Sequence, residues 1–172
     1  MSADPERDNA CIEASGFTLE IDIAPAAIAL EPALNEAVAS AIQAANDTTG
    51  PVQGCVGVLV TDDARIRELN KQWRKIDKPT NVLSFAYPAQ PAGPARYIGD
   101  LAISYETAVR EAAVESKSIS DHVAHLCVHG FLHLLGYDHE ADAEAETMER
   151  LERIILARIG VGDPYIASEA EG

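Results

Sequence analysis

Hydrophobic and polar residues alternate along short segments in the first two thirds of the chain. Residues 17–23 (FTLEIDI) place an apolar side chain at every second position, which is typical of a half-buried strand. Residues 55–61 (CVGVLVT) are mostly apolar, as expected of a buried strand. Residues 80–87 (TNVLSFAY) and 99–105 (GDLAISY) also have strand character, and a loop rich in proline and alanine separates them. The pattern therefore predicts about four strands.

Apolar residues with helical spacing separate some of these strands and dominate the last third of the chain. Asp62 and Asp63 can cap the helix that begins beside them, because a carboxylate accepts hydrogen bonds from the free backbone N–H groups of a first turn. Ser118 and Asp121 resemble a capping box at the start of a later helix. Gly136 can end that helix in a left-handed conformation. The regions with helical spacing are residues 32–46, 63–74, 105–115, 121–135 and 140–158.

Strands in the first two thirds and helices in the last third predict an α+β fold. We expect a single domain over residues 16–160, with a mixed β-sheet of about four strands packed against helices. Residues 1–15 are polar and acidic without an apolar period, so we predict a disordered tail there. Residues 161–172 are predicted to be a C-terminal tail.

Composition is that of an ordinary intracellular domain. The chain has 172 residues, enough to bury a core without disulfide support. Cys11, Cys55 and Cys127 are scattered and form no close pair, which indicates reduced thiols and argues against a disulfide framework. The first residues have no signal-peptide pattern, and no segment approaches the roughly 20 apolar residues of a membrane span. We therefore expect a cytoplasmic protein without a membrane partner.

The net charge of −15 argues at first against a polyanionic partner, because nucleic-acid binding normally requires a basic surface. The charge is unevenly distributed, however, since residues 51–100 carry seven basic and five acidic side chains. Most of these bases are interpreted as the solvated face of a helix, which leaves one or two for a functional role. The seven basic residues are Arg65, Arg67, Lys71, Arg74, Lys75, Lys78 and Arg96.

Every histidine of the chain lies within a stretch of eighteen residues that ends at residue 139. On a helix over residues 121–135 the first four share one face, and buried imidazoles on such a helix need partners. The five histidines are His122, His125, His129, His133 and His139.

His129 and His133 stand four residues apart and can direct two imidazoles to one point, the usual helical arrangement for two ligands of a transition metal. After Gly136, the chain can turn back so that His139 reaches the same point. The full pattern H-x3-H-x2-G-x2-H fits a three-histidine site with an open fourth position, which is typical of catalytic rather than structural zinc. We therefore predict a metal site on the helix of the C-terminal third and the turn that follows it.

The other polar residues of this stretch keep more than one interpretation. His125 could be a fourth ligand, a partner of a ligand or a proton shuttle, and His122 is interpreted as a surface residue. Asp138 could orient a ligand ring, or it could belong to ordinary turn chemistry. Cys127 lies on the apolar side of the helix and is expected in the core.

A metalloprotease-like hydrolase is the first alternative, because the H-x3-H-x5-H spacing is also that of metzincin peptidases. These enzymes need a glutamate directly after the first histidine, to take a proton from water at the metal. Gly130 occupies that position in this chain and has no side chain. A peptidase would have to recruit its base from elsewhere, so this alternative is weakened but not removed.

Three motifs resemble those of one known family. Residues 129–139 (HGFLHLLGYDH) are similar to the H-G-x-L-H-L-x-G-Y-D-H signature of the YbeY family, which comprises bacterial endoribonucleases and ribosomal-RNA maturation factors. Residues 78–85 (KPTNVLSF) and 99–104 (GDLAIS) resemble the second and third motifs of that family. The resemblance implies a catalytic or phosphate-contacting arginine, here Arg74. It also implies one Zn²⁺ or similar divalent transition metal per chain, held by His129, His133 and His139 at the catalytic centre.

The implied function is that of a metal-dependent, single-strand-specific endoribonuclease in late ribosome biogenesis, in 16S rRNA 3′-end maturation and in ribosome quality control. RNA in the small ribosomal subunit would be the partner, with an Era-type GTPase and a small-subunit ribosomal protein as further candidates. DNA is not expected. The assignment is chemically coherent, because a metal can polarise a phosphoryl oxygen while the guanidinium of Arg74 neutralises developing charge. The nucleophile remains open between water at the metal and the RNA 2′-hydroxyl.

A non-catalytic ribosome-assembly adaptor with a structural metal is the remaining alternative. The lack of a fourth protein ligand in the motif argues against it. Such an adaptor would bind metal and ribosomal partners without cleaving RNA.

Overall fold

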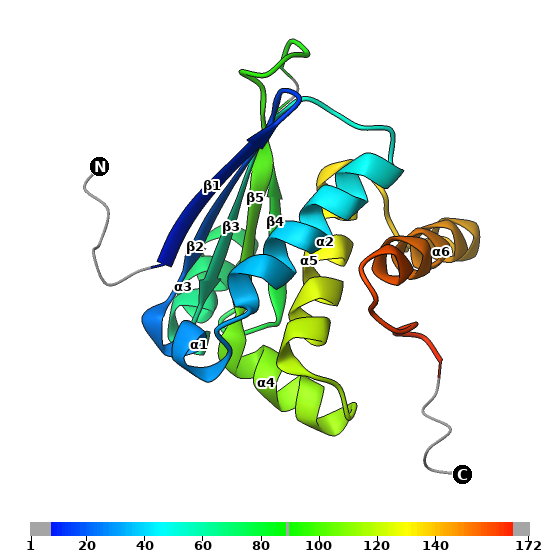
Figure 1. Cartoon of the computed structure of the whole chain (residues 1–172). Helices are drawn as coiled ribbons and strands as arrows, with labels where there is room; N and C mark the ends of the chain where they lie inside the picture. Colours follow the sequence, from blue (N-terminus) through cyan, green and yellow to red (C-terminus); the bar gives the residue numbers. More distant parts are fainter. Residues whose placement is uncertain (1–7, 89, 167–172) are drawn as a thin grey trace.

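The computed structural model describes residues 8–88 and 90–166, and in this part of the chain five strands form one mixed sheet in the order β1-β2-β3-β5-β4 (Figure 1). The pairs β2–β3 and β3–β5 are parallel, whereas the edge strands β1 and β4 run antiparallel to β2 and β5. The strands are β1 Asp8–Ala14, β2 Phe17–Ile23, β3 Gly54–Thr61, β4 Val82–Ala86 and β5 Tyr97–Ser104.

Helices cover the two faces of the sheet unequally. α2 and α5 pack against each other and against one face, α6 lies on the outer side of α5, and α3 contacts β5 from behind the sheet (Figure 1). The main core therefore fills the space between the sheet and the α2–α5 pair. The described helices are α1 Pro25–Leu30, α2 Leu34–Thr48, α3 Asp63–Arg74, α4 Tyr105–Val114, α5 Ile119–Leu134 and α6 Asp142–Arg158.

These observations confirm the predicted α+β fold. β2 has the predicted bounds, and its buried residues Phe17, Leu19, Ile21 and Ile23 alternate with more exposed ones. The sequence predicts a buried strand for β3, but from Gly54 to Val60 buried residues alternate with half-buried ones, because α3 leaves part of the second sheet face uncovered. No described helix is long and apolar enough to cross a membrane.

The helix caps follow the predicted chemistry. The Oδ1 atom of Asp62 accepts a hydrogen bond from the backbone N–H of Arg65 at 2.8 Å at the start of α3. The Oγ atom of Ser118 accepts one from the backbone N–H of Asp121 at 3.0 Å at the start of α5. α1 was not predicted; it begins with Pro25, whose fixed φ suits a first helical turn.

The predicted disordered tail is wrong for residues 8–15. These residues form β1 and the start of a tight turn, where Ser15 and Gly16 both have positive φ values of 53° and 80°. Positive φ at both central positions makes a hairpin turn whose twist matches the strands that flank it. β1 thus gains order from backbone pairing with β2, and Ala10 and Ile12 pack partly against the core. Residues 1–7 of the predicted tail lie outside the described residues.

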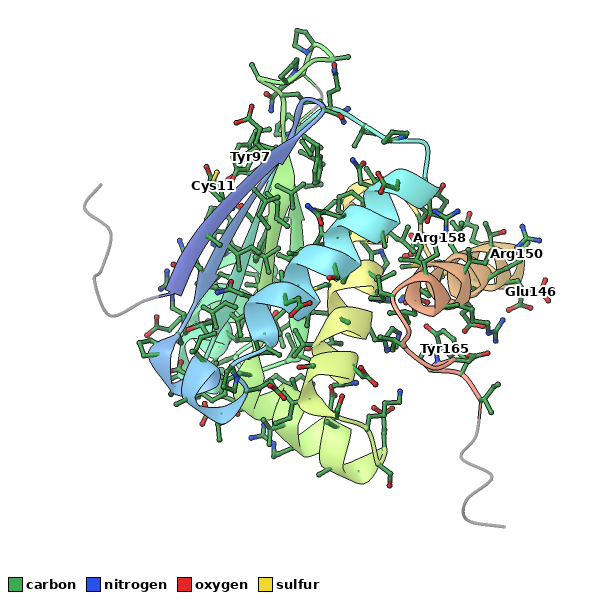
Figure 2. The ribbon with its side chains drawn as sticks, in the orientation of Figure 1. Cys11, Tyr97, Glu146, Arg150, Arg158 and Tyr165 are labelled. Carbon is green, nitrogen blue, oxygen red and sulfur yellow. The ribbon has the colours of Figure 1, made fainter. Side chains whose placement is uncertain are left out.

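The chain continues past α6 into a short C-terminal segment, residues 161–166, which the sequence predicts to be part of a tail. It runs back beneath α6, and Figure 2 shows the side chain of Tyr165 on it. Val161 packs partly against the core, and the backbone N–H of Tyr165 donates to the Oδ1 atom of Asp163 at 2.8 Å. The segment is therefore attached to the domain, and residues 167–172 lie outside the described residues.

Candidate metal centre

α5 carries its apolar residues into the core and leaves its histidine face toward α6. Cys127, Val128 and Phe131 are fully buried between the sheet and α2, which confirms the core position predicted for Cys127. All three cysteines are free thiols, as predicted. The helix orientation is thus set by its apolar side, and the histidines are aligned as a consequence.

His129, His133 and His139, the histidine triad, converge as predicted. One nitrogen from each ring can be chosen so that all lie within 4.8 Å of one another, and they form the one such group of metal-ligating side chains found in residues 8–88 and 90–166. The Nε2 atoms of His129 and His133 are 3.1 Å apart. Two ligands bonded at 2.0–2.1 Å to a tetrahedral ion would stand about 3.3 Å apart. The spacing of this pair therefore suits a zinc-type ion.

His139 reaches the triad because the chain reverses after α5. Gly136 has a φ of 98°, and its N–H donates to the carbonyl oxygen of His133 at 3.0 Å, while the N–H of Tyr137 donates to that of Leu132 at 3.1 Å. These two bonds are the Schellman motif that ends many helices at a glycine. The His139 ring centroid then lies 5.1 Å from that of His133.

Hydrogen bonds at the outer ring nitrogens orient the two helical ligands. The Nδ1 atom of His133 is 3.0 Å from the carbonyl oxygen of Tyr137, and the Nδ1 atom of His129 is 2.8 Å from the Oε1 atom of Glu152. Each Nδ1 therefore carries the proton, which leaves both Nε2 lone pairs facing each other. Two such lone pairs repel unless a cation lies between them, so the donor set fits a metal ion.

The electrostatics of His133 agree with this arrangement. Burial, and then the neighbouring His129, lower the pKa of His133, so its imidazole stays neutral at pH values where an exposed histidine would be protonated. A neutral imidazole is the form that binds metal. Asp138 accepts a hydrogen bond from the backbone N–H of His139 at 2.7 Å, and its carboxylate lies 3.9 Å from the Nδ1 atom of His139. Asp138 therefore stabilises the turn through a hydrogen bond to the backbone, whereas its carboxylate is too far from the His139 ring for a hydrogen bond.

Glu152, on α6, was missed from the sequence. Its side chain is 1% exposed. Its Oε1 atom accepts a hydrogen bond from the Nδ1 atom of His129, and its Oε2 atom accepts one from the hydroxyl of Tyr165 at 2.5 Å. Burial would raise the pKa of Glu152, but its contacts with His125, His129 and Tyr165 outweigh burial and lower the pKa to about 2. The carboxylate is thus ionised beside the triad. A glutamate on the apolar stripe of α6, four residues after Met148, was the signal that could have identified it.

The remaining two histidines also have partners on other elements. His122 is 4% exposed, with Nε2 at 2.9 Å from the Oε1 atom of Glu111, so the predicted surface position is wrong. The reason is that α4 packs against the start of α5 and covers it. His125 does not join the triad; its Nε2 atom lies 3.3 Å from Glu152.

A cavity of about 510 Å³, the triad cavity, opens beside the three histidines. Arg74, at the end of α3, lines it, although α3 lies behind the sheet. Its Nη2 atom donates to the carbonyl oxygen of Ser84 at 2.5 Å, and its guanidinium lies 5.7 Å from the ring centre of Phe85. β4 is the edge strand, so an arginine from behind the sheet reaches around it to the histidine side. Further lining residues are Asn81, Val82, Ala86, His125, Leu126, Leu134 and Tyr165.

Two other bases of α3 form ion pairs at the surface, as the solvated-face interpretation predicts. Arg67 binds Asp77 with Nε to Oδ1 at 2.7 Å, and Arg65 lies 3.2 Å from Glu68. Neither of these arginines lines the triad cavity. Arg74 is therefore distinguished from them by its position rather than by its charge.

Gly130 faces the sheet and not the triad cavity. A Cβ atom at this position would lie 2.8 Å from a methyl carbon of the buried Leu101 and 3.2 Å from the hydroxyl of Ser84. Ser84 also donates from its hydroxyl to the carbonyl oxygen of Gly130 at 3.2 Å. The close approach of α5 to the sheet therefore leaves no room for the glutamate that a metzincin peptidase carries there, which weakens the peptidase alternative further.

Behind the sheet lies a second and larger cavity of about 1000 Å³, the sheet groove. It occupies the face that α3 leaves uncovered. Arg74, Ser84 and Ala86 line both this groove and the triad cavity, so the two hollows meet at the β4 edge. Aromatic side chains line the groove, among them Trp73, which is 63% exposed.

Comparison with known proteins places these features in a family. A family model described as Endoribonuclease YbeY matches residues 21–160. A protein named Endoribonuclease YbeY from Chelativorans sp. strain BNC1 is 50% identical over 152 residues, which cover 87% of this chain and 93% of that protein. Another of that name, from Rhodopseudomonas palustris, is 46% identical over 175 residues, covering 97% and 91%. A solution structure from Thermotoga maritima has 21% identity and a TM-score of 0.48, covering 78% of this chain and 92% of that one. The family match includes Arg74 and the triad but ends before Tyr165.

Proposed function

The chain belongs to the YbeY endoribonuclease family, and from this premise we propose that it is a metal-dependent, single-strand-specific endoribonuclease. The observation that carries the proposal is the joint placement of the histidine triad and Arg74 around one cavity. A divalent metal ion held by the three neutral imidazoles, together with the guanidinium, would suit an anionic substrate whose reaction develops more negative charge, as phosphodiester cleavage does.

The residues of the chain divide the chemistry among themselves. His129, His133 and His139 would hold a zinc-type ion, which when bound would supply Lewis-acid polarisation of a phosphoryl oxygen and would favour deprotonation of water. Glu152 and the carbonyl oxygen of Tyr137 fix the rings of His129 and His133, so the ligands need no rearrangement. Arg74 offers a planar fork of donors that matches two phosphate oxygens. Its bond to Ser84 keeps that fork at the cavity.

The sheet groove supports single-stranded RNA as the substrate class. It continues from the triad cavity and carries exposed aromatic side chains, on which unpaired bases can stack. Trp73 and Phe85 already form an edge-to-face pair with ring centres 6.4 Å apart, next to Arg74. A duplex would keep its bases stacked internally and could not use such a platform.

We further propose the cellular role that family membership suggests: late ribosome biogenesis in the cytoplasm, including 16S rRNA 3′-end maturation and ribosome quality control. The small ribosomal subunit is the proposed site of action, with an Era-type GTPase and a small-subunit ribosomal protein as candidate partners. A net charge of −15 gives little general attraction to RNA, which is consistent with a need for such partners to deliver the substrate.

The decisive experiment compares RNA and peptide substrates on metal-loaded protein. We expect about one divalent transition metal per chain, with zinc the preferred ion, and cleavage of single-stranded RNA that a chelator abolishes. Duplex RNA, DNA and casein should remain intact. His133→Ala should lose both the metal and RNA cleavage. His122→Gln is the matched control, because it changes a histidine of the same helix face outside the triad and should keep both.

Each alternative predicts a different outcome. Peptide cleavage that disappears in His133→Ala would identify a peptidase. A metal-replete protein that binds ribosomal subunits and leaves RNA intact would identify the adaptor. Full metal content in His133→Ala would remove the triad as the metal site.

A further inference from the structure

We infer that Tyr165 is a positioning residue of the metal centre. Its hydroxyl holds Glu152 in one orientation, and Glu152 in turn holds the ring of His129. This inference rests on the proposed metal centre and extends it to the C-terminal segment, beyond the residues that the family model matches. Tyr165 lines the triad cavity, although it follows α6 and is far in sequence from all three ligands.

The first step concerns the two oxygens of Glu152. Oε1 accepts from the Nδ1 atom of His129 at 2.8 Å, and Oε2 accepts from the hydroxyl of Tyr165 at 2.5 Å. A carboxylate that is bonded at one oxygen only can rotate about its last side-chain bond at little cost. With both oxygens bonded, the plane of the carboxylate is set, and so is the direction from which His129 donates.

The second step concerns how Tyr165 itself is held. Asp163 accepts from the backbone N–H of Tyr165 at 2.8 Å and from the Nε atom of Arg153 at 3.2 Å. The Arg153 guanidinium also lies 5.3 Å from the centre of the Tyr165 ring. One α6 residue thus contacts both the turn and the ring. The position of the hydroxyl is therefore determined by the segment and does not depend on Glu152 alone.

The third step concerns the other side of the ring. Tyr165 meets the ring of His125 edge to face, with centroids 5.7 Å apart and planes at 86°. His125 in turn lies 3.3 Å from Oε1 of Glu152. The phenol therefore closes one end of the pocket around the carboxylate and limits the access of water to it. Burial, and then the Glu152 carboxylate, raise the pKa of Tyr165, so its hydroxyl remains a donor over the working pH range.

A purely structural role for Tyr165 makes a different prediction. If the phenol only attaches the C-terminal segment, loss of its hydroxyl should reduce the stability of the fold and leave the metal centre unchanged. If it positions Glu152, loss of the hydroxyl should change the affinity and geometry of the metal site while metal-free protein remains stable. Groups that hold a ligand from outside the coordination sphere typically contribute about 10- to 100-fold to metal affinity.

The test uses the full chain and zinc alone, with no RNA. Tyr165→Phe, Glu152→Gln and the double variant are titrated in competition with a chromophoric chelator, and the visible spectrum of the Co²⁺-substituted protein reports ligand geometry. We expect roughly tenfold weaker zinc binding for Tyr165→Phe and a larger loss, up to roughly 100-fold, for Glu152→Gln. The double variant should bind zinc no more weakly than Glu152→Gln, because the phenol acts through the carboxylate.

Tyr87→Phe is the matched control. It removes a phenol that donates to another carboxylate, Asp100, at 3.0 Å, and Tyr87 does not line the triad cavity. Zinc affinity should stay at the wild-type value in this variant. Wild-type affinity and an unchanged Co²⁺ spectrum in Tyr165→Phe would overturn the inference, as would additive losses in the double variant. A wild-type chain that binds no zinc would refute the proposed metal centre itself, and the inference with it.

Discussion

Replacing Arg74 by lysine gives a sharp test of the proposed catalysis, because it preserves charge and removes geometry. The guanidinium presents several N–H donors in one plane, whereas a lysine ammonium is a compact point charge on a flexible stem. If Arg74 contacts the scissile phosphate through two donors, Arg74→Lys should slow cleavage by about 10²-fold. That loss corresponds to about 2.7 kcal/mol in the activation free energy. Arg74→Glu should be slower still.

The structural contacts of Arg74 set the change in stability that accompanies the substitution. Its described contacts are one hydrogen bond to the Ser84 carbonyl and one cation–π contact with Phe85, both at the surface. Together they are worth at most about 2 kcal/mol. For a chain of this length the melting temperature should fall by no more than about 8 °C. Folded, metal-loaded Arg74→Lys protein is therefore expected, and the rate loss can be measured on it.

The assay is single-turnover cleavage of a labelled single-stranded RNA at saturating enzyme, with metal content and thermal unfolding measured on the same samples. Arg67→Lys is the matched control, because Arg67 lies on the same helix, pairs with Asp77 and lines neither cavity. It should cleave at the wild-type rate. Wild-type cleavage by Arg74→Lys and also by Arg74→Ala would refute the reasoning and return Arg74 to the solvated face of α3.

Two further predictions concern the framework around the site. Gly99→Ala places a Cβ atom 2.5 Å from the carbonyl oxygen of Phe85 and 2.6 Å from a methyl carbon of Leu134, so it should destabilise the fold by about 1–3 kcal/mol. Thermal unfolding should show this loss for Gly99→Ala. The control Gly162→Ala, whose Cβ meets nothing within 4 Å, should change the stability by no more than about 0.5 kcal/mol. Equal melting temperatures for the two variants would contradict the close packing of β5 against β4 and α5. Burial would raise the pKa of Asp63, but hydrogen bonds from Ser104, Thr107 and Arg110 outweigh it and lower the pKa below the ordinary value of 3.8. Asp63 therefore stabilises the folded state at pH values above its ordinary pKa, and this contribution is lost as the pH falls through the lower pKa of the folded state. Urea unfolding should find Asp63→Asn about 1–3 kcal/mol less stable than the wild-type protein at neutral pH, and this difference in stability should narrow below about pH 4. A difference that widens on acidification would contradict the assignment.

Local sequence determined the elements and the ligands that depend on neighbours in the chain. The alternation in residues 17–23 predicted β2, and the helical spacing after Asp62 predicted α3 with its cap. The triad was predictable for the same reason. His129 and His133 share a face by helical periodicity, and Gly136 returns the chain so that His139 comes near them. All of this geometry lies within eleven residues, where backbone conformation alone sets the distances.

Tertiary packing decided everything that depends on partners far apart in sequence. β1 lacks the regular alternation of large apolar side chains that identified β2, and it exists because β2 offers it an edge to pair with. His122 is buried because α4 brings Glu111 to it, and Gly130 faces the sheet because α5 approaches Leu101 closely. None of these contacts has a periodic signal in the sequence.

The metal centre shows the same division. The three ligands were identifiable from their spacing. Glu152 and Tyr165 stand 23 and 36 residues after His129 in the sequence. They come near His129 only because α6 packs along α5 and the chain then turns back. Arg74 reaches the triad cavity from behind the sheet because β4 is an edge strand. Local periodicity determines which face of a helix a side chain occupies, whereas the free energy of burying that face against another element decides which distant residue meets it.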